Sequence, residues 1–227
     1  GRDKLYSVIA HDLRSPMGSI KMVLNMLILN LPVEKIGTEM HELLTMANRT
    51  TEDVFSLLDN LLKWTKSQIG NLNVVYQDID AVEVMDSVID VFNMIAGLKK
   101  ITIREEKPEK LPVCADIDML KTVIRNLLSN AIKFSNENSE VLVKMEEQGD
   151  MVVVSVKDNG CGIDEEGQKK LLHTDTHFST FGTNNEEGSG LGLLLCQDFV
   201  VKNGGKLWFT SKQGEGSTFY FSIPLKK

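Results

Sequence analysis

Apolar residues recur at steps of three and four along the first seventy residues of the chain. One series runs from Leu5 to Leu31 and a second from Met40 to Leu62, with the spacing of amphipathic helices. Pro32 and Gly37 fall between the two series and predict a turn. The pattern therefore predicts two long helices in an antiparallel hairpin. The apolar stripe is wider than two helices can cover for each other, so we expect two copies to pair as a four-helix bundle.

Beyond Gly70, a polar link over residues 71–78 leads into mixed helical and strand patterns. Helical spacing predicts helices over residues 79–98, 116–134 and 191–203. Alternation of apolar and polar residues predicts strands over 101–104, 140–146, 151–156, 206–210 and 217–223. Gln148-Gly149-Asp150 is a hairpin signal between two of these strands. The expected fold class is thus an α-helical hairpin followed by an α+β sandwich, with helices on one face of a mainly antiparallel sheet.

The charge of the chain is divided unevenly between these two regions. Residues 1–70 are neutral, and residues 71–227 carry the whole net charge of −7. This balance disfavours binding to nucleic acid or to an anionic membrane surface. No apolar run approaches the roughly 20 residues that span a bilayer. Because the chain starts inside a helical pattern, we expect a fragment of a longer protein that makes no membrane contact itself.

The first candidate site is the segment from His11 to Pro16 on the first helix. Helical spacing puts His11 on the polar face, where a neutral imidazole is a good nucleophile. Asp12 can hold one ring nitrogen protonated and leave the other free to attack. Pro16 removes a helical hydrogen bond, so we expect the helix to bend or loosen just below His11. The alternative from these residues alone is a surface histidine beside a tolerated kink.

The second candidate is one face of the helix predicted over residues 116–134. Asn126, Asn130 and Lys133 are spaced by four and then three residues and share a face. Carboxamide oxygens suit a hard cation and an ammonium suits an anion, so these three side chains fit a magnesium-bound phosphate. The alternative is an ordinary solvated helix face.

The third candidate directly follows the strand predicted over residues 151–156. Asp158 can accept a hydrogen bond from an exocyclic amine, while Gly160 and Gly162 allow the backbone to approach a flat ligand closely. An equally simple interpretation is a strand-to-helix turn in which Asp164 caps the next helix.

The fourth candidate is a group of glycines before the last helix, at positions 188, 190 and 192. Gly188, Gly190 and Gly192 expose backbone N–H groups and the positive end of a helix, a geometry that binds anions. Their spacing matches neither the P-loop nor the dinucleotide-binding fingerprint. The long polar loop over residues 173–187 is a candidate lid.

Taken in order, these motifs resemble the five boxes of the sensor histidine kinases of two-component systems. The H-box corresponds to His11-Asp12-Leu13-Arg14-Ser15-Pro16, the N-box to residues 126–134, the G1-box to 158–163, the F-box to 178–181 and the G2-box to 188–193. The resemblance covers essentially the whole chain. It implies a dimerising phosphoacceptor hairpin over residues 1–70 and a catalytic ATP-binding domain of the gyrase, Hsp90 and histidine kinase type over residues 71–227.

The resemblance also implies ligands for the individual residues. Asp158 would bind the adenine amine of ATP, and Asn130 would ligate Mg²⁺ with Asn126 and Lys133 close by. The remaining nucleotide contacts implied by the boxes are Phe134, Gly160, Gly162, Gly188, Gly190, Leu191, Gly192 and, in the last strand, Thr218.

The activity implied is autophosphorylation of His11 and transfer of the phosphoryl group to an aspartate of a response-regulator receiver domain, with Asp12 as the base or orienting group. Related ATPases carry a glutamate at the position of Asn126, and an amide there cannot activate water. Ser15 replaces a more usual threonine, so regulator phosphatase activity is left open. We expect a homodimer that forms the cytoplasmic portion of a larger sensor protein, whose membrane anchoring the sequence leaves open. The competing functions are an ATPase of the gyrase type and a nucleotide-binding scaffold without chemistry.

Overall fold

The computed structural model describes residues 2–68, 73–171 and 191–226, and for residues 2–12, 68 and 170 it describes the backbone only. The chain divides into two compact units, Gly1–Asn73 and Val74–Lys227. Within the described residues, no helix is both long and apolar enough to cross a membrane. The two units are described separately below.

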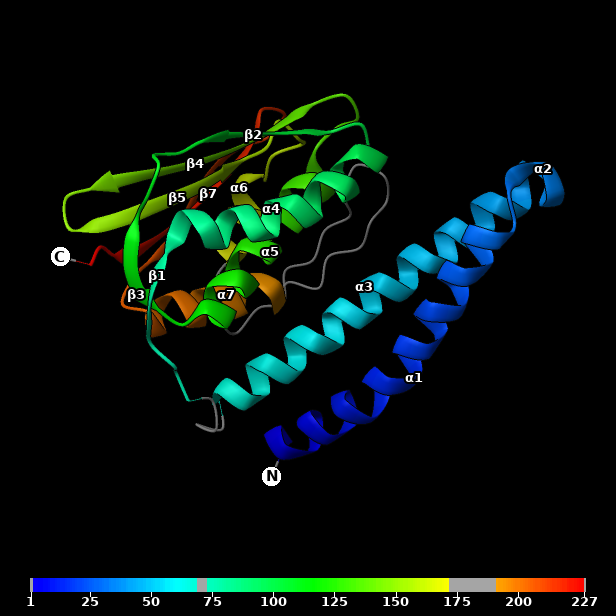
Figure 1. Cartoon of the computed structure of the whole chain (residues 1–227), viewed down its shortest axis with the longest axis horizontal. Coiled ribbons are helices and arrows are strands. Elements are labelled where there is room, and N and C mark those ends of the chain that lie inside the picture. The colour runs from blue at the N-terminus through cyan, green and yellow to red at the C-terminus, as the bar shows by residue number, and fades with distance from the viewer. Residues whose placement is uncertain (1, 69–72, 172–190, 227) are drawn as a thin grey trace. The chain divides into compact units, whose positions relative to one another are not determined.

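The first unit is a helical hairpin (Figure 1). Helix α1 spans Arg2–Asn30 and α3 spans Thr38–Gln68. The sequence predicts a turn between them, but the connection also contains the single-turn helix α2, Val33–Ile36, which ends at Gly37 with a φ of 80°. Helix α1 is continuous through Pro16. Leu58 and Leu62 form the small core of this unit, packed against Met17, Val54 and Leu61.

Much of the apolar surface of the hairpin is not covered within one chain. On α1, the side chains of Met22, Val23, Met26 and Leu29 are 61%, 52%, 56% and 82% exposed. On α3, Met40, Leu43 and Met46 are about half exposed or more. A surface of this kind is typical of a helix face that packs against another molecule.

The second unit is built around a five-stranded sheet in the order β2-β4-β5-β7-β6. The strands are β2, Thr102–Glu106; β4, Glu140–Gln148; β5, Met151–Lys157; β6, Leu207–Lys212; and β7, Gly216–Pro224. Only the β2–β4 pair among these is parallel. The turn between β4 and β5 contains Gly149 at a φ of 61°, as the hairpin signal predicts.

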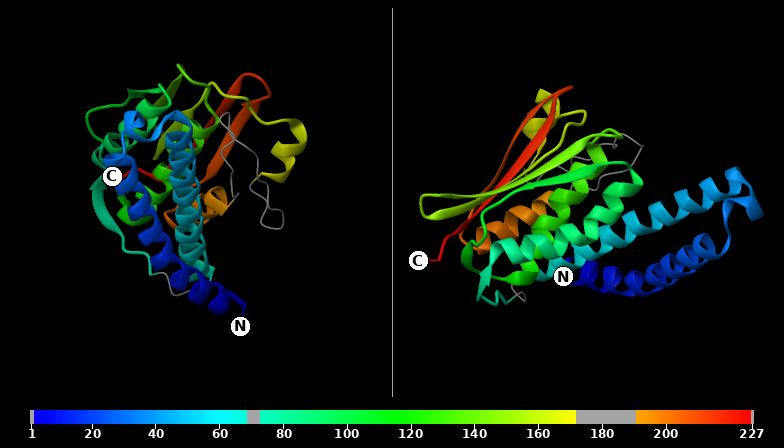
Figure 2. Two further views of the ribbon diagram at one scale, coloured as in Figure 1. Left: turned by 90° about the vertical axis from the view of Figure 1, so that its right-hand side faces the viewer. Right: turned by 45° about the horizontal axis from the view of Figure 1, so that its top comes forward.

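Three helices cover one face of this sheet (Figure 2). They are α4, Ala81–Leu98; α5, Ile117–Phe134; and α7, Leu191–Lys202. Val141, Val143 and Met145 of β4 point into the core and alternate with half-exposed neighbours. Phe221 and Ile223 of β7 are also buried. The prediction of a helical hairpin followed by an α+β sandwich is therefore confirmed.

Several short elements differ from the sequence prediction. Residues 77–80 form strand β1, Gln77–Asp80, although they were expected to belong to the polar link and the start of a helix. Strand β1 pairs antiparallel with β3, Pro112–Ala115. Helix α4 begins only after Asp80, whose carboxylate caps it by accepting from the N–H of Val82 at 2.9 Å. A short helix α6, Glu165–Lys170, follows β5.

Candidate functional site

Helix α5 presents a polar face as its sequence predicts. Its first turn is fixed by Asp116, whose carboxylate accepts from the N–H groups of Asp118 and Met119 at 3.0 Å. Its opposite face is buried in the core, through Leu120, Val123, Ile124, Leu127, Leu128 and Ala131. Asn126, Asn130 and Lys133 are all half-buried on the remaining face.

The two asparagines of this face differ in their hydrogen bonding. The carboxamide nitrogen of Asn126 donates to the carbonyl of Thr122 at 2.9 Å, one turn earlier in the same helix. The side chain of Asn130 makes no hydrogen bond with any residue that the structure describes. A half-buried amide oxygen that no described residue engages is a suitable ligand for a hard cation. The donor chemistry at Asn130 therefore fits Mg²⁺.

Among the described carboxylates, Asp158 has the most strongly shifted pKa. It follows β5, and only 4% of it is exposed. Its Oδ1 accepts from the backbone N–H of Gly160 at 2.9 Å and from that of Ser217 at 3.3 Å. Burial raises the pKa of Asp158 to about 6, and the two backbone donors oppose this rise only partly. A buried acceptor held in place by backbone donors is suited to binding a specific donor group of a ligand.

The loop that follows Asp158 requires glycine at two positions. A Cβ on Gly160 would lie 1.9 Å from the carbonyl oxygen of Phe134, and a Cβ on Gly162 would lie 2.1 Å from that of Lys212. Gly162 also has a φ of 64°. The contact between Gly160 and Phe134 brings the loop of Asp158 against the C-terminal end of α5. Two of the predicted sites are thereby joined into one.

The alternative interpretation of this loop, a turn capped by aspartate, is also correct in part. Asp164 caps α6, and its carboxylate accepts from the N–H of Gly167 at 2.7 Å. Capping by Asp164 and the buried position of Asp158 are compatible, because the two carboxylates lie at different ends of the loop.

Residues near the start of β7 make contacts that the sequence alone did not identify. The N–H of Ser217 donates to Asp158, and its hydroxyl lies 2.8 Å from that of Ser211. Thr218, predicted to approach the nucleotide, pairs in register with exposed Lys157 on one side and exposed Thr210 on the other. Ser217 shares the strand face of buried Phe219 and Phe221. The alternation of inward and outward side chains along the strand is the sequence signal that could have placed Ser217 on the buried face.

The other predicted residues are described only in part. Leu191 and Gly192 form the first turn of α7, whereas Gly188, Gly190, the F-box and the candidate lid lie outside the described residues. His11 and Asp12 lie in α1, but their side chains are outside the description. Their predicted roles stay predictions.

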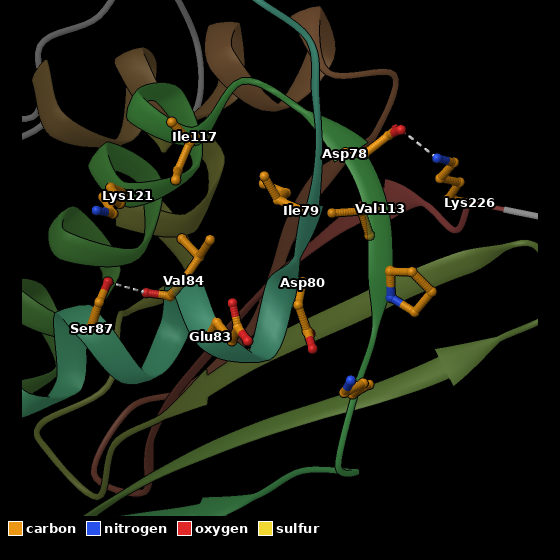
Figure 3. A pocket seen from close by; sticks show the side chains of 12 residues that line it. Asp78, Ile79, Asp80, Glu83, Val84, Ser87, Val113, Ile117, Lys121 and Lys226 are labelled. Carbon is orange, nitrogen blue, oxygen red and sulfur yellow. Dashed lines mark hydrogen bonds and ion pairs between the residues drawn. The ribbon is translucent and has the colours of Figure 1, made fainter.

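A groove of about 640 Å³ lies elsewhere on the second unit (Figure 3). Its lining includes Asp78, Ile79, Val84 and Val113, and an ion pair joins Asp78 to Lys226 at its edge. None of the residues predicted to bind nucleotide lines it. Within the described residues, no group of three His, Cys, Asp or Glu side chains forms a metal site.

The fold and the joined site define a class of nucleotide-binding domain. Residues 115–227 match the family of histidine kinase-, DNA gyrase B- and HSP90-like ATPases. The catalytic domain of the histidine kinase ThkA is 31% identical and has a TM-score of 0.58; the match covers 66% of this chain and 95% of that domain. Full-length ShkA in complex with AMPPNP has a TM-score of 0.71 over 99% of this chain at 20% identity, which is a likeness of fold.

The likeness extends into the helical hairpin. The adaptive-response sensory kinase SasA of Crocosphaera subtropica is 30% identical over 99% of this chain and 59% of its own length. The chain belongs to the sensor histidine kinases, a family of ATP-dependent protein kinases of two-component systems. It spans somewhat more than half the length of this curated relative.

Proposed function

We propose that the chain is a histidine autokinase whose second unit binds ATP with Mg²⁺ and phosphorylates His11. The observation that carries this proposal is the meeting of two features at one place. Buried Asp158 offers an acceptor held by Gly160, and Gly160 touches the end of the helix that carries Asn130 and Lys133. An acceptor for the adenine amine and ligands for a magnesium triphosphate are the two halves of an ATP site.

In the proposed site, each residue binds a different part of magnesium ATP. Asp158 accepts from the adenine amine, Asn130 ligates Mg²⁺, and Lys133 contacts the phosphates. Magnesium, when bound, neutralises charge that develops on the phosphate oxygens. Asn126 is engaged with the carbonyl of its own helix and carries no basic group. Asn126 therefore does not activate water, which disfavours hydrolysis and keeps the phosphoryl group for a positioned nucleophile.

The proposed transfer runs from the γ-phosphate of ATP to a ring nitrogen of His11. The bond between the γ-phosphorus and its bridging oxygen breaks, a phosphorus–nitrogen bond forms, and ADP leaves. Asp12 orients the imidazole or accepts its proton. If this is correct, Asp12→Asn slows autophosphorylation while leaving ATP affinity unchanged; a wild-type rate in this variant contradicts the assigned role.

Incubation with γ-labelled ATP and Mg²⁺ tests the activity directly. An autokinase yields a label on His11 that is acid-labile and base-stable. His11→Gln should abolish that label while ATP still binds, and Asn130→Ala should abolish magnesium-dependent binding. Free phosphate without labelled protein indicates an ATPase of the gyrase type. Nucleotide binding without either product indicates a scaffold.

We also propose that two chains pair through the hairpin. The exposed apolar side chains of Val23, Met26 and Leu29 support this proposal, since a helix bundle of two copies would bury them. Met26→Glu should convert a dimer into a monomer in size-exclusion chromatography with light scattering. Val91→Glu is the control, because Val91 is 61% exposed on α4 of the other unit. Equal dimer content in both variants contradicts this interface.

The proposed acceptor of the phosphoryl group is an aspartate of a response-regulator receiver domain. Transfer from His11-labelled chain to an added receiver domain, followed by gel separation, tests this step. Ser15 stands where relatives usually carry threonine, so phosphatase activity is tested separately, as release of inorganic phosphate by water from a labelled receiver domain to which the chain is added. Because the chain matches 59% of the SasA relative, we propose that it forms the cytoplasmic part of a longer sensor.

A further inference from the structure

Lys99 is a buried lysine that no sequence motif singles out. It directly follows α4, and only 8% of it is exposed. Its ammonium donates to the carbonyl of Ile132 at 3.1 Å and to that of Lys133 at 2.8 Å. Both carbonyls belong to the last turn of α5. A lysine so deeply buried normally has a specific charge to satisfy.

The backbone around Lys99 is fixed by a tight helix ending. The N–H groups of Lys99 and Ile101 both donate to the carbonyl of Ala96, at 3.0 and 2.9 Å. Between them, Lys100 takes a left-handed conformation with a φ of 56°. Ala96 and Ile101 are themselves buried, at 1% and 4% exposure. The start of the Lys99 side chain is thereby held in place before any ligand binds.

The last turn of α5 is the negative end of a helix dipole. The side chain of Lys133 projects from this turn, and the carbonyl of Phe134 touches Gly160, which in turn donates to Asp158. A polyphosphate brought to this end of a helix meets unfavourable electrostatics, in contrast to the usual anion site at a helix N-terminus. An ammonium bonded to two of the terminal carbonyls offsets that repulsion.

We propose that Lys99 is a positioning residue for the phosphates of the nucleotide, an inference that rests on the proposed ATP site. It acts through α5, because its ammonium fixes the last turn and neutralises the negative helix end. Lys133 and Asn130 can then bind the triphosphate without electrostatic repulsion from that helix end. The proposal assigns Lys99 no contact with ATP itself. Its effect should therefore depend on ligand charge.

The test compares binding of magnesium ATP and of uncharged adenosine by calorimetry in the whole chain. Lys99→Gln keeps a donor for the carbonyls but removes the charge, and should weaken ATP about 3- to 10-fold while changing adenosine less than about 2-fold. Lys99→Arg should keep the wild-type preference. Lys100→Gln is the matched control, since Lys100 is exposed and its side chain bonds to no described residue.

Equal weakening of ATP and adenosine by Lys99→Gln, or no change in either, overturns the proposal but not the ATP site. Failure of the wild type to bind ATP overturns both. If Lys99→Gln does not fold, Lys99→Arg still decides, because a lost preference for ATP in this charge-preserving variant contradicts the argument and a retained one supports it.

Discussion

Replacing Asp158 with asparagine should stabilise the nucleotide-free protein. Asparagine keeps the Oδ1 that accepts from Gly160 and Ser217, but it cannot ionise. Burial raises the pKa of Asp158 from 3.8 to about 6, so ionisation costs more in the folded state than in the unfolded chain. Each tenfold change in an equilibrium is about 1.4 kcal/mol, and the full cost above pH 6 is about 3 kcal/mol.

The sign of the pH dependence follows from the raised pKa. The stability contributed by protonated Asp158 is fully present below about pH 3.8 and is lost as the pH rises through about 6. Between about pH 5 and about pH 7.5 the wild type should lose about 1.4 kcal/mol from this group. The stability advantage of Asp158→Asn should grow by that amount over the same interval.

Urea unfolding of the nucleotide-free protein at the two pH values measures this difference. The two tryptophans are Trp64 in the hairpin and Trp208 in β6, so a Trp64→Phe background makes fluorescence report on the second unit alone. Asp118→Asn, at an exposed position, should change stability by less than about 0.5 kcal/mol. A stability difference between Asp158→Asn and wild type that is the same at both pH values refutes the reasoning. Loss of ATP binding should accompany the gain in stability.

Three further outcomes are expected. Gly160→Ala should lower stability by about 1–3 kcal/mol and abolish ATP binding, because its Cβ would lie 1.9 Å from the Phe134 carbonyl oxygen; Gly97→Ala, with no atom within 4 Å of the new Cβ, should not lower the melting temperature. Cys161 is exposed and lies between Gly160 and Gly162 of the proposed site. Bound Mg-ATP should therefore slow its alkylation, and equal labelling rates with and without nucleotide would count against a nearby ligand. Leu62→Ala should destabilise the hairpin by about 2–5 kcal/mol in urea melts, and an unchanged urea midpoint would contradict the place of Leu62 in the hairpin core.

The long elements were predictable because their patterns repeat several times. Helix α5 has five turns of apolar spacing, and buried positions alternate with half-exposed ones in β4 from Glu140 to Glu146. Strands β1 and β3 have four residues each, too few for a period to stand out. These strands form because they pair with each other, although α4 and β2 separate them in the sequence. Such pairing is a tertiary effect.

The places of the candidate residues in the fold were predictable to a similar degree, while their chemical roles stay predictions. Residue type and spacing identified Asp158 and the polar face of α5, but not the contact of Gly160 with Phe134 that unites them. The sequence did not single out Lys99, because a lysine that follows a helix is ordinarily a solvated cap. Only the packing of α4 beside α5 shows that its ammonium reaches the carbonyls of Ile132 and Lys133.

The place of β7 in the sheet has a consequence for the order of folding. It is the last strand in sequence, yet it lies between β5 and β6, and its Ser217 both accepts from the N–H of Asp158 and donates to its carboxylate. Helices α1 and α3 belong to the first unit, so they can begin to pair as soon as α3 is synthesised. The hydrogen bonds that hold Asp158 can form only after β7 has been inserted. In a newly made chain, α1, which carries the proposed phosphoacceptor His11, is therefore in place before the proposed ATP site is complete.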